Sequence, residues 1–294
     1  MSEQRASGVT GGDPIEVRPM EAGDLEAGLR LAGAAGWNQR IDDWRLVHTM
    51  SPGANFVAIF ENRLVGTTVT VNYGNRVSWI AMVLVDPALR RRGIATRLMA
   101  AALGALAGSE TIKLDATPAG REVYLRLGFV DEGVVTRLQT PAAPPPAARP
   151  AGIRPMTPAD WQAVLALDER VFGTLRAALL PGLFHLAPGY AWVAEGRSGL
   201  EGFCLGRPGM RGEYLGPVTA LGVEAARELA LAAFGAMGGK PALVDVPEWQ
   251  PEFQSWLKGR GFEEQRTFAR MRKGPEAYPG LPASVFGIAG PEFG

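Results

Sequence analysis

The stretch that decides the fold reads Val83-Leu84-Val85-Asp86-Pro87-Ala88-Leu89-Arg90-Arg91-Arg92-Gly93-Ile94-Ala95. It opens as the end of an apolar run over residues 79–85, which is typical of a buried strand, and Asp86-Pro87 ends that strand. After the arginines and the glycine, apolar residues return at helical spacing, at Ile94, Leu98, Ala102 and Leu106. The stretch therefore predicts a strand, a basic turn and a helix N-terminus. The free N–H groups of such a terminus bind anions such as a pyrophosphate.

Two motifs in the first half resemble the signatures of the GNAT superfamily of acyl-CoA N-acyltransferases. The spacing Arg90-x-x-Gly93-x-Ala95 resembles the family's Arg/Gln-x-x-Gly-x-Gly/Ala signature, with alanine in place of the commoner second glycine. Downstream, Tyr124-Leu125-Arg126-Leu127-Gly128-Phe129 resembles its Tyr-x-x-x-Gly-Phe motif. A surface arginine cluster on an ordinary α/β domain would explain the charges, but not the downstream tyrosine and Gly-Phe pair.

Composition limits the classes of protein to which the chain can belong. Its 294 residues are enough for two domains, and 47% hydrophobic and 20% charged residues are ordinary for a soluble globular protein. Net charge is zero, so no overall field attracts nucleic acid or an anionic membrane, and no apolar run is long enough to span a bilayer. The single cysteine, Cys204, excludes an internal disulfide and fits the cytoplasm. It lies in an apolar stretch, which favours a buried thiol, and with two histidines it gives no metal-ligand cluster.

The chain is expected to divide at a proline-rich segment, because five prolines fall within residues 141–150 and favour a stiff extended spacer. The expected parts are a disordered lead (1–13), an N-terminal catalytic domain (14–140), a Pro/Ala-rich linker (141–151), a divergent C-terminal domain (152–274) and a tail (275–294). Apolar residues in the tail suggest that it docks on the protein.

The two halves also look like copies of one unit. Val17-Arg18-Pro19-Met20 recurs as Ile153-Arg154-Pro155-Met156, and Gly128-Phe129 recurs as Gly261-Phe262. Echoes in the same order favour an internal duplication over chance. Each half predicts a strand, two helices, three strands, a long helix, a strand, a short helix and a final strand that closes the half. The fold class is therefore α/β (α+β), with two GNAT-like domains, each a mixed, mostly antiparallel twisted sheet flanked by helices.

The resemblance implies that the first half binds acetyl-CoA as acyl donor. The backbone of the basic turn and helix start would hold the pyrophosphate, and Gly93 would allow close approach because it has no Cβ. The backbone of the preceding strand would pair with the pantetheine arm and stabilise an oxyanion. A plain core strand is the alternative for these three residues and is compatible with that role. The expected donor-binding residues are Val83, Leu84, Val85, Arg90, Arg91, Arg92, Gly93, Ile94, Ala95 and Thr96.

The resemblance further assigns Tyr124 as the general acid that protonates the departing thiolate, since a phenol with a pKa of about 10 stays protonated at neutral pH. Packing alone is the alternative role for this tyrosine. The general base stays unassigned; the nearest acidic or imidazole side chains along the sequence are Asp42, Asp43, His48 and Glu61.

The acceptor pocket of this fold usually forms around the first two helices, which points to Trp37, Asn38 and Trp44. Asn38 could instead be only a helix cap and Trp44 only a core residue. Thr117 is a weak substitute for the asparagine that many GNAT domains place near CoA.

The second half lacks both signatures. Residues 218–224 read Val-Thr-Ala-Leu-Gly-Val-Glu, and Leu257 stands where the tyrosine would recur. We expect this half to have lost CoA binding and to pack on the first half, where it would complete or cover the acceptor site. Arg207 is expected in a solvated surface turn, with binding of an anionic acceptor group as the alternative.

Together these features predict a cytoplasmic N-acetyltransferase that moves an acetyl group from acetyl-CoA to a primary amine by direct attack, without a metal. The acceptor would be a small-molecule or peptide amine, with neither nucleic acid nor membrane as partner; acceptor identity and oligomeric state stay open. The alternatives are a non-catalytic acyl-CoA-sensing module and an acyltransferase that uses a longer acyl-CoA.

Overall fold

The computed structural model describes residues 15–74, 76–146, 152–197, 199–276 and 280–294. The predicted disordered lead (1–13) and the end of the predicted linker lie outside these ranges. The beginning of that linker packs on the second half: the N–H of Ala143 donates to the carbonyl oxygen of Lys240 at 2.7 Å, and Ala143 is buried.

The first half follows the predicted element order. Its elements are β1 (Ile15–Pro19), α1 (Leu25–Ala34), α2 (Ile41–Met50), β2 (Phe56–Phe60), β3 (Arg63–Tyr73), β4 (Val77–Val85), α3 (Ile94–Ala105), β5 (Thr111–Ala116), α4 (Pro118–Arg126) and β6 (Val130–Thr140). Strands β2 and β3 form a tight hairpin, because Glu61 and Asn62 both adopt positive φ angles (48° and 59°), as a type I′ turn requires.

The second half repeats that order and adds a strand. Its elements are β7 (Ile153–Pro155), α5 (Trp161–Phe172), α6 (Leu179–Leu186), β8 (Trp192–Gly196), β9 (Gly199–Arg207), β10 (Glu213–Ala220), α7 (Val223–Ala236), β11 (Ala242–Pro247), α8 (Pro251–Lys258), β12 (Glu263–Lys273) and β13 (Val285–Gly287). Short 3-10 helices cover Ala22–Asp24, Pro87–Leu89, Pro158–Asp160, Pro188–Tyr190 and Pro282–Ser284.

The sequence echo at the start of each half corresponds to the same contact. Arg18 forms an ion pair with Asp24 at 2.7 Å, and Arg154 forms one with Asp160 at 2.7 Å, six residues on in both cases. Each aspartate also accepts a hydrogen bond from the backbone N–H three residues before it, at 2.8 Å for Asp24 and 2.7 Å for Asp160. The repeated motif therefore fixes the entry from the first strand into the first helix, which supports the duplication.

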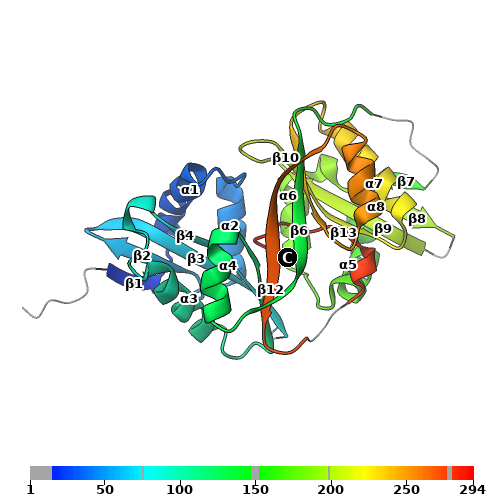
Figure 1. Ribbon diagram of the computed structural model, residues 1–294. Coiled ribbons are helices and arrows are strands. Elements are labelled where there is room, and N and C mark those ends of the chain that lie inside the picture. Colours follow the sequence, from blue (N-terminus) through cyan, green and yellow to red (C-terminus); the bar gives the residue numbers. More distant parts are fainter. Residues whose placement is uncertain (1–14, 75, 147–151, 198, 277–279) are drawn as a thin grey trace, which may run out of the picture.

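The two halves share one sheet, and the expectation that each final strand closes its own half is wrong. In the described part of the chain the sheet has 13 strands in the order β1-β2-β3-β4-β5-β12-β6-β11-β10-β9-β8-β7, with β13 paired to β10. Strand β12 of the second half lies between β5 and β6, and β6 of the first half pairs with β11. Figure 1 shows β6 and β12 running together between the two lobes. The halves have thus exchanged their last strands.

Two equivalent ion pairs lie where the exchanged strands meet their new neighbours. Arg270 of β12 stands opposite Asp115 of β5, and both of its contacting nitrogens are 2.9 Å from the carboxylate oxygens. Arg137 of β6 stands opposite Asp245 of β11, at 2.7 and 2.6 Å. The two carboxylates are 0% exposed. Bidentate geometry is the strongest form of such a pair, so each one fixes the register of an exchanged strand.

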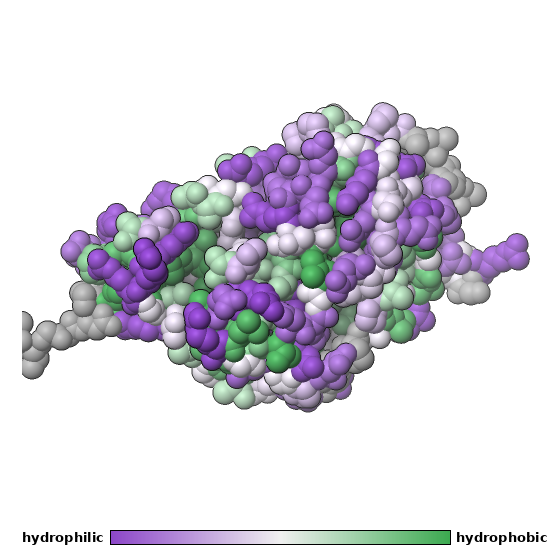
Figure 2. Space-filling model, in the orientation of Figure 1, coloured by the Kyte–Doolittle hydropathy of each residue, from purple (hydrophilic) through white to green (hydrophobic). Residues whose placement is uncertain are grey.

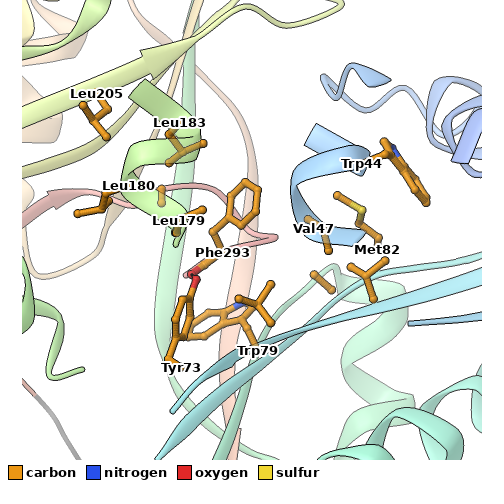
Figure 3. Packing of buried hydrophobic residues seen from close by; sticks show 14 of the residues in the cluster. Trp44, Val47, Tyr73, Trp79, Met82, Leu179, Leu180, Leu183, Leu205 and Phe293 are labelled. Carbon is orange, nitrogen blue, oxygen red and sulfur yellow. Dashed lines mark hydrogen bonds between the residues drawn. The ribbon is translucent and has the colours of Figure 1, made fainter. Parts of the chain in front are cut away.

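One hydrophobic core also spans the halves. The largest cluster combines Tyr73 and Trp79 of the first half with Leu179 and Leu183 of α6 and with Phe293 of the tail. Figure 3 shows Phe293 beside Tyr73, whose hydroxyl donates to the Phe293 carbonyl oxygen at 2.8 Å. The tail therefore docks, as expected. On the face drawn in Figure 2, hydrophilic residues cover most of the surface and apolar patches are separate.

The buried pair makes a stability prediction. We expect Asp115→Asn to lower the free energy of unfolding by roughly 3–5 kcal/mol, because Arg270 would keep its charge inside the sheet without a counter-ion. Urea denaturation measures this. The matched control is Asp131→Asn, which removes the partner of Arg121 from an exposed pair on β6 and should leave the midpoint nearly unchanged. Equal losses in the two variants would contradict the role given to the buried pair.

Candidate active site

A groove opens between β4 and β5. Residues 77–79 of β4 pair with residues 111–113 of β5. Beyond them β4 continues to Val85 and β5 to Ala116, and in the described ranges the two strands do not pair with each other again. An extra residue in β4 near Met82 shifts its register against β3, and Met82 has a φ of 48°. The Thr67 hydroxyl donates to the Met82 carbonyl oxygen at 2.7 Å and holds this bulge. The predicted pantetheine-binding residues, Val83, Leu84 and Val85, thus lie on the strand that leaves its neighbour.

The basic turn follows at the end of β4. Asp86 caps it by accepting the N–H of Ala88 at 3.0 Å. Arg91 and Gly93 have φ angles of 62° and 76°, and Gly93 is the N-cap of α3. Glycine suits that position because an L side chain is strained there. The turn is exposed at Arg90, Arg91, Arg92 and Gly93. The free N–H groups of the first turn of α3, which include those of Ile94, Ala95 and Thr96, therefore lie next to an open surface.

Tyr124 reaches the other end of the groove from α4. Thr117 caps this helix by accepting the N–H of Gly120 at 3.3 Å, and the Tyr124 ring lies against that first turn. A Cβ at position 120 would stand 2.9 Å from the ring and 3.3 Å from its hydroxyl oxygen, so Gly120 makes the room that the ring occupies. Tyr124 is buried, and this burial raises its pKa above that of a free phenol. The hydroxyl therefore stays protonated at physiological pH.

A pocket of about 830 Å³, partly open to solvent, adjoins Tyr124 and the β4 bulge. Its walls come from both halves: the loop between α1 and α2, β4, β5 and α4 on one side, and β9, β10, β12 and the tail on the other. Val83, Thr117 and Tyr124 are the donor-side residues from the sequence analysis that line it. The residues of the basic turn do not.

Of the three predicted acceptor residues, two line the pocket and one does not. Trp37 and Asn38 line the pocket. Asn38 also joins the halves: its side chain donates to the Gly212 carbonyl oxygen at 2.9 Å and accepts the N–H of Arg211 at 2.8 Å. It does not cap α2, whose N-cap is Arg40. Trp44 is not in the pocket lining; it is buried in the core against Gly28.

Arg207 is buried, so the expected solvated turn is wrong. Its guanidinium donates to Asp43 at 2.8 Å, to Glu292 at 2.6 Å and to the Ala289 carbonyl oxygen at 2.7 Å. All three charged side chains line the pocket. Strand β9 ends at Arg207, and the tail folds back to supply Glu292, which neutralises the cation inside the protein.

Asp43 and Glu292 are two buried carboxylates that share one cation, Arg207. Burial raises the pKa of each; the charge of Asp43 raises the pKa of Glu292 further, and the charge of Asp42 raises that of Asp43. Of the four base candidates that sequence position suggested, Asp43 is in the pocket lining, whereas Asp42, His48 and Glu61 are not. Glu292 gave no sequence signal, because it is an isolated acidic residue near the end of a glycine- and proline-rich tail.

The corresponding groove of the second half is filled by the chain itself. Strand β10 pairs with β11 only over residues 213–215 in the described ranges, so these strands also separate. Strand β13 enters the gap: Val218 pairs with Gly287, and the N–H of Ile288 donates to the Asp245 carbonyl oxygen at 3.0 Å. Leu257, at the position of Tyr124, is fully buried. The backbone edge that is free in the first half is occupied here.

Within the described residues, no helix is both long and apolar enough to cross a bilayer. In the same ranges, no cluster of three or more His, Cys, Asp or Glu side chains could hold a metal ion.

Comparisons with known proteins agree with this geometry. Residues 26–137 and residues 164–287 each match a family described as an acetyltransferase (GNAT) domain, and together these matches span most of the chain. A holothin acyltransferase from Pseudoalteromonas sp. (strain SANK 73390) is 26% identical over 268 residues, which are 89% of this chain and 88% of that protein.

Solved structures share the fold. A Pyrococcus horikoshii protein, provisionally described as an acetyltransferase, superposes with a TM-score of 0.82 at 23% identity, over 100% of both chains. A tandem GNAT protein from the clavulanic acid biosynthesis pathway does so with a TM-score of 0.61 at 19% identity, over 89% of this chain and 99% of the other. This chain therefore belongs to the GNAT superfamily of acyltransferases and carries two GNAT domains in tandem.

Proposed function

We propose that the protein is an N-acetyltransferase that moves an acetyl group from acetyl-CoA to a primary amine. The observation that carries the proposal is the arrangement of the groove between β4 and β5. The buried, protonated Tyr124 lies at one end of this groove, and at the other end β4 leads to the exposed N-terminus of α3. In the second half the equivalent groove is filled by β13, which supports a single donor site per chain.

Each part of acetyl-CoA would meet chemically suitable groups along the groove. The N–H groups of residues 93–96 and the arginines at 90–92 offer partial and full positive charge to the pyrophosphate. The backbone of Val83, Leu84 and Val85 offers hydrogen bonds to the amides of the pantetheine arm. The thioester would then lie near the bulge at Met82, next to the Tyr124 hydroxyl.

We propose that the Asp43–Glu292 pair takes the proton from the ammonium form of the acceptor, since its raised pKa makes it a better base than a solvated carboxylate. The free amine attacks the thioester carbonyl carbon and a C–N bond forms; the C–S bond then breaks, and the nitrogen loses its second proton to solvent. Tyr124 donates its proton to the departing sulfur and regains one from solvent. No covalent enzyme intermediate is needed. Cys204 is a poor nucleophile, because burial raises its pKa to about 12.

The same thiol supports a cytoplasmic location for the enzyme, because Cys204 is free and buried. Trp37 and the second-half residues that line the pocket would shape the acceptor site. We also propose that the two domains span residues 14–140 and residues 152–274, and that the exchange of β6 and β12 joins them.

Donor binding is tested at Gly93. We expect Gly93→Asp to weaken acetyl-CoA binding at least about 10-fold in calorimetry, because it places a negative charge and a strained φ at the helix N-terminus. The matched control is Gly104→Asp on the exposed side of the same helix, which should bind as the wild type does. Unchanged affinity in Gly93→Asp would mean that the donor binds elsewhere.

Proton donation is tested at Tyr124. We expect Tyr124→Phe to lower kcat by roughly 10²-fold with acetyl-CoA affinity unchanged, because the ring keeps its contact with Phe129 and only the proton donor is lost. Release of CoA against a panel of primary amines measures this. If kcat is retained, Tyr124 serves packing alone.

The base is tested by the pH dependence of kcat/KM for the acceptor. The carboxylate pair must be ionised to accept a proton, so activity should fall as pH drops through its raised pKa. Glu292→Gln should shift this acid limb or remove it. The raised pKa of Tyr124 predicts no loss of activity from its ionisation up to about pH 10. An acid limb that is identical in the wild type and in Glu292→Gln would exclude Glu292.

A further inference from the structure

One arginine in the pocket wall has no counter-ion among the residues that the structure describes. Arg266 of β12 lines the pocket and stands directly opposite Arg137 of β6 in the strand register. Like charges at opposed positions repel. Arg137 is neutralised by its two hydrogen bonds to Asp245 at 2.7 and 2.6 Å. For Arg266, the described part of the chain supplies neither a hydrogen bond nor an ion pair.

The other two arginines of the pocket wall have carboxylate partners. Arg207 is held by Asp43, Glu292 and a carbonyl oxygen, and Arg137 is held by Asp245. The environment of Arg266 disfavours its charge: partial burial and the nearby Arg137 and Arg211 lower its pKa, and Asp245 offsets this only in part. The guanidinium is still a cation at neutral pH, with all of its N–H donors available. A bound anion would satisfy those donors.

The internal duplication shows that Arg266 belongs to one pocket only. Gly128-Phe129 and Arg137 of β6 correspond to Gly261-Phe262 and Arg270 of β12, a constant offset that pairs Arg266 with Gly133. Gly133 stands opposite Arg270, as Arg266 stands opposite Arg137. The arginine is therefore present on the side that holds Tyr124 and replaced by glycine on the other side.

A second polar group in the same wall has no hydrogen-bond partner within the described residues. The side chain of Gln39 is buried and lines the pocket, and within the described residues its carbonyl oxygen Oε1 accepts no hydrogen bond. It could accept an N–H of the acceptor amine. The pocket therefore presents a free anion-binding group and a free acceptor, beside the Asp43–Glu292 pair.

We propose that Arg266 binds an anionic oxygen group of the acceptor, so that the preferred acceptors are small molecules with both a primary amine and a carboxylate or phosphate-type anion. The anion is assigned to the acceptor and not to CoA, because Arg266 lines the pocket whereas the turn at residues 90–96 does not. Planar carboxylates fit a guanidinium through two parallel hydrogen bonds. This inference rests on the proposed acetyl transfer.

The test compares amines that carry an anion with neutral amines of similar length. The pairs are 4-aminobutyrate with 4-aminobutanamide and 3-aminopropylphosphonate with 3-aminopropanol, each with acetyl-CoA and full-length protein. We expect the wild type to favour the anionic member at least about 10-fold in kcat/KM. Arg266→Gln should abolish that preference mainly through KM, and Arg266→Lys should keep part of it. The carboxylate and the phosphonate distinguish the two kinds of anion.

A matched control is Arg211→Gln, which removes an exposed neighbouring arginine outside the pocket lining and should leave the preference unchanged. Calorimetry with acetyl-CoA should give the same affinity for the wild type and Arg266→Gln. Equal use of charged and neutral amines, or a preference that survives Arg266→Gln, would overturn the inference while leaving acetyl transfer intact. Weaker acetyl-CoA binding in Arg266→Gln would assign the arginine to the donor instead. Acetyl-CoA binding without turnover of any amine would count against the proposed transfer itself.

Discussion

The pair of opposed Arg–Asp contacts at the centre of the sheet is the interaction on which the rest of the structure depends. Asp115 with Arg270, and Asp245 with Arg137, each join a strand of one half to the final strand of the other. Charges this deeply buried are tolerated only when both partners are present and well oriented. They specify where β6 and β12 insert, and so they turn two copies of a fold into one sheet with one shared core.

This exchange explains why the second half is retained although its groove is filled. Strand β12 supplies the wall of the pocket that contains Arg266 and Phe268, and β9 supplies Arg207. The tail first enters the second-half groove as β13 and then crosses to the shared pocket. There Glu292 accepts a hydrogen bond from Arg207 of β9, and the Trp79 ring nitrogen of the first half donates to the Pro291 carbonyl oxygen at 3.0 Å. One segment thus closes one groove and completes the wall of the other.

Local features could be read from the sequence, because they depend on neighbours along the chain. The apolar run ending at Val85 and the glycine at the start of α3 both form as their patterns predict. Strand exchange could not be predicted in this way. The order of apolar and polar residues in β6 and β12 would be the same whichever half each strand joined, so it does not specify the neighbouring strand. The burial of Arg207 and the presence of Glu292 in the pocket depend on that long-range arrangement and on the path of the tail, so no local pattern indicated them. Trp44 shows the converse: its position near the expected acceptor loop suggested a site residue, whereas the small Gly28 beside it makes it part of the core.

The most direct test of the account is to express residues 14–146 and residues 152–294 as separate chains, alone and together, and to measure acetyl-CoA binding by calorimetry. Residues 14–146 contain every predicted donor-binding residue, but β5 would lack its partner β12 and Asp115 would lack Arg270. The account predicts that neither fragment binds alone and that the co-expressed fragments associate and bind as the intact chain does. Binding of acetyl-CoA by residues 14–146 alone, with the affinity of the intact chain, would contradict it.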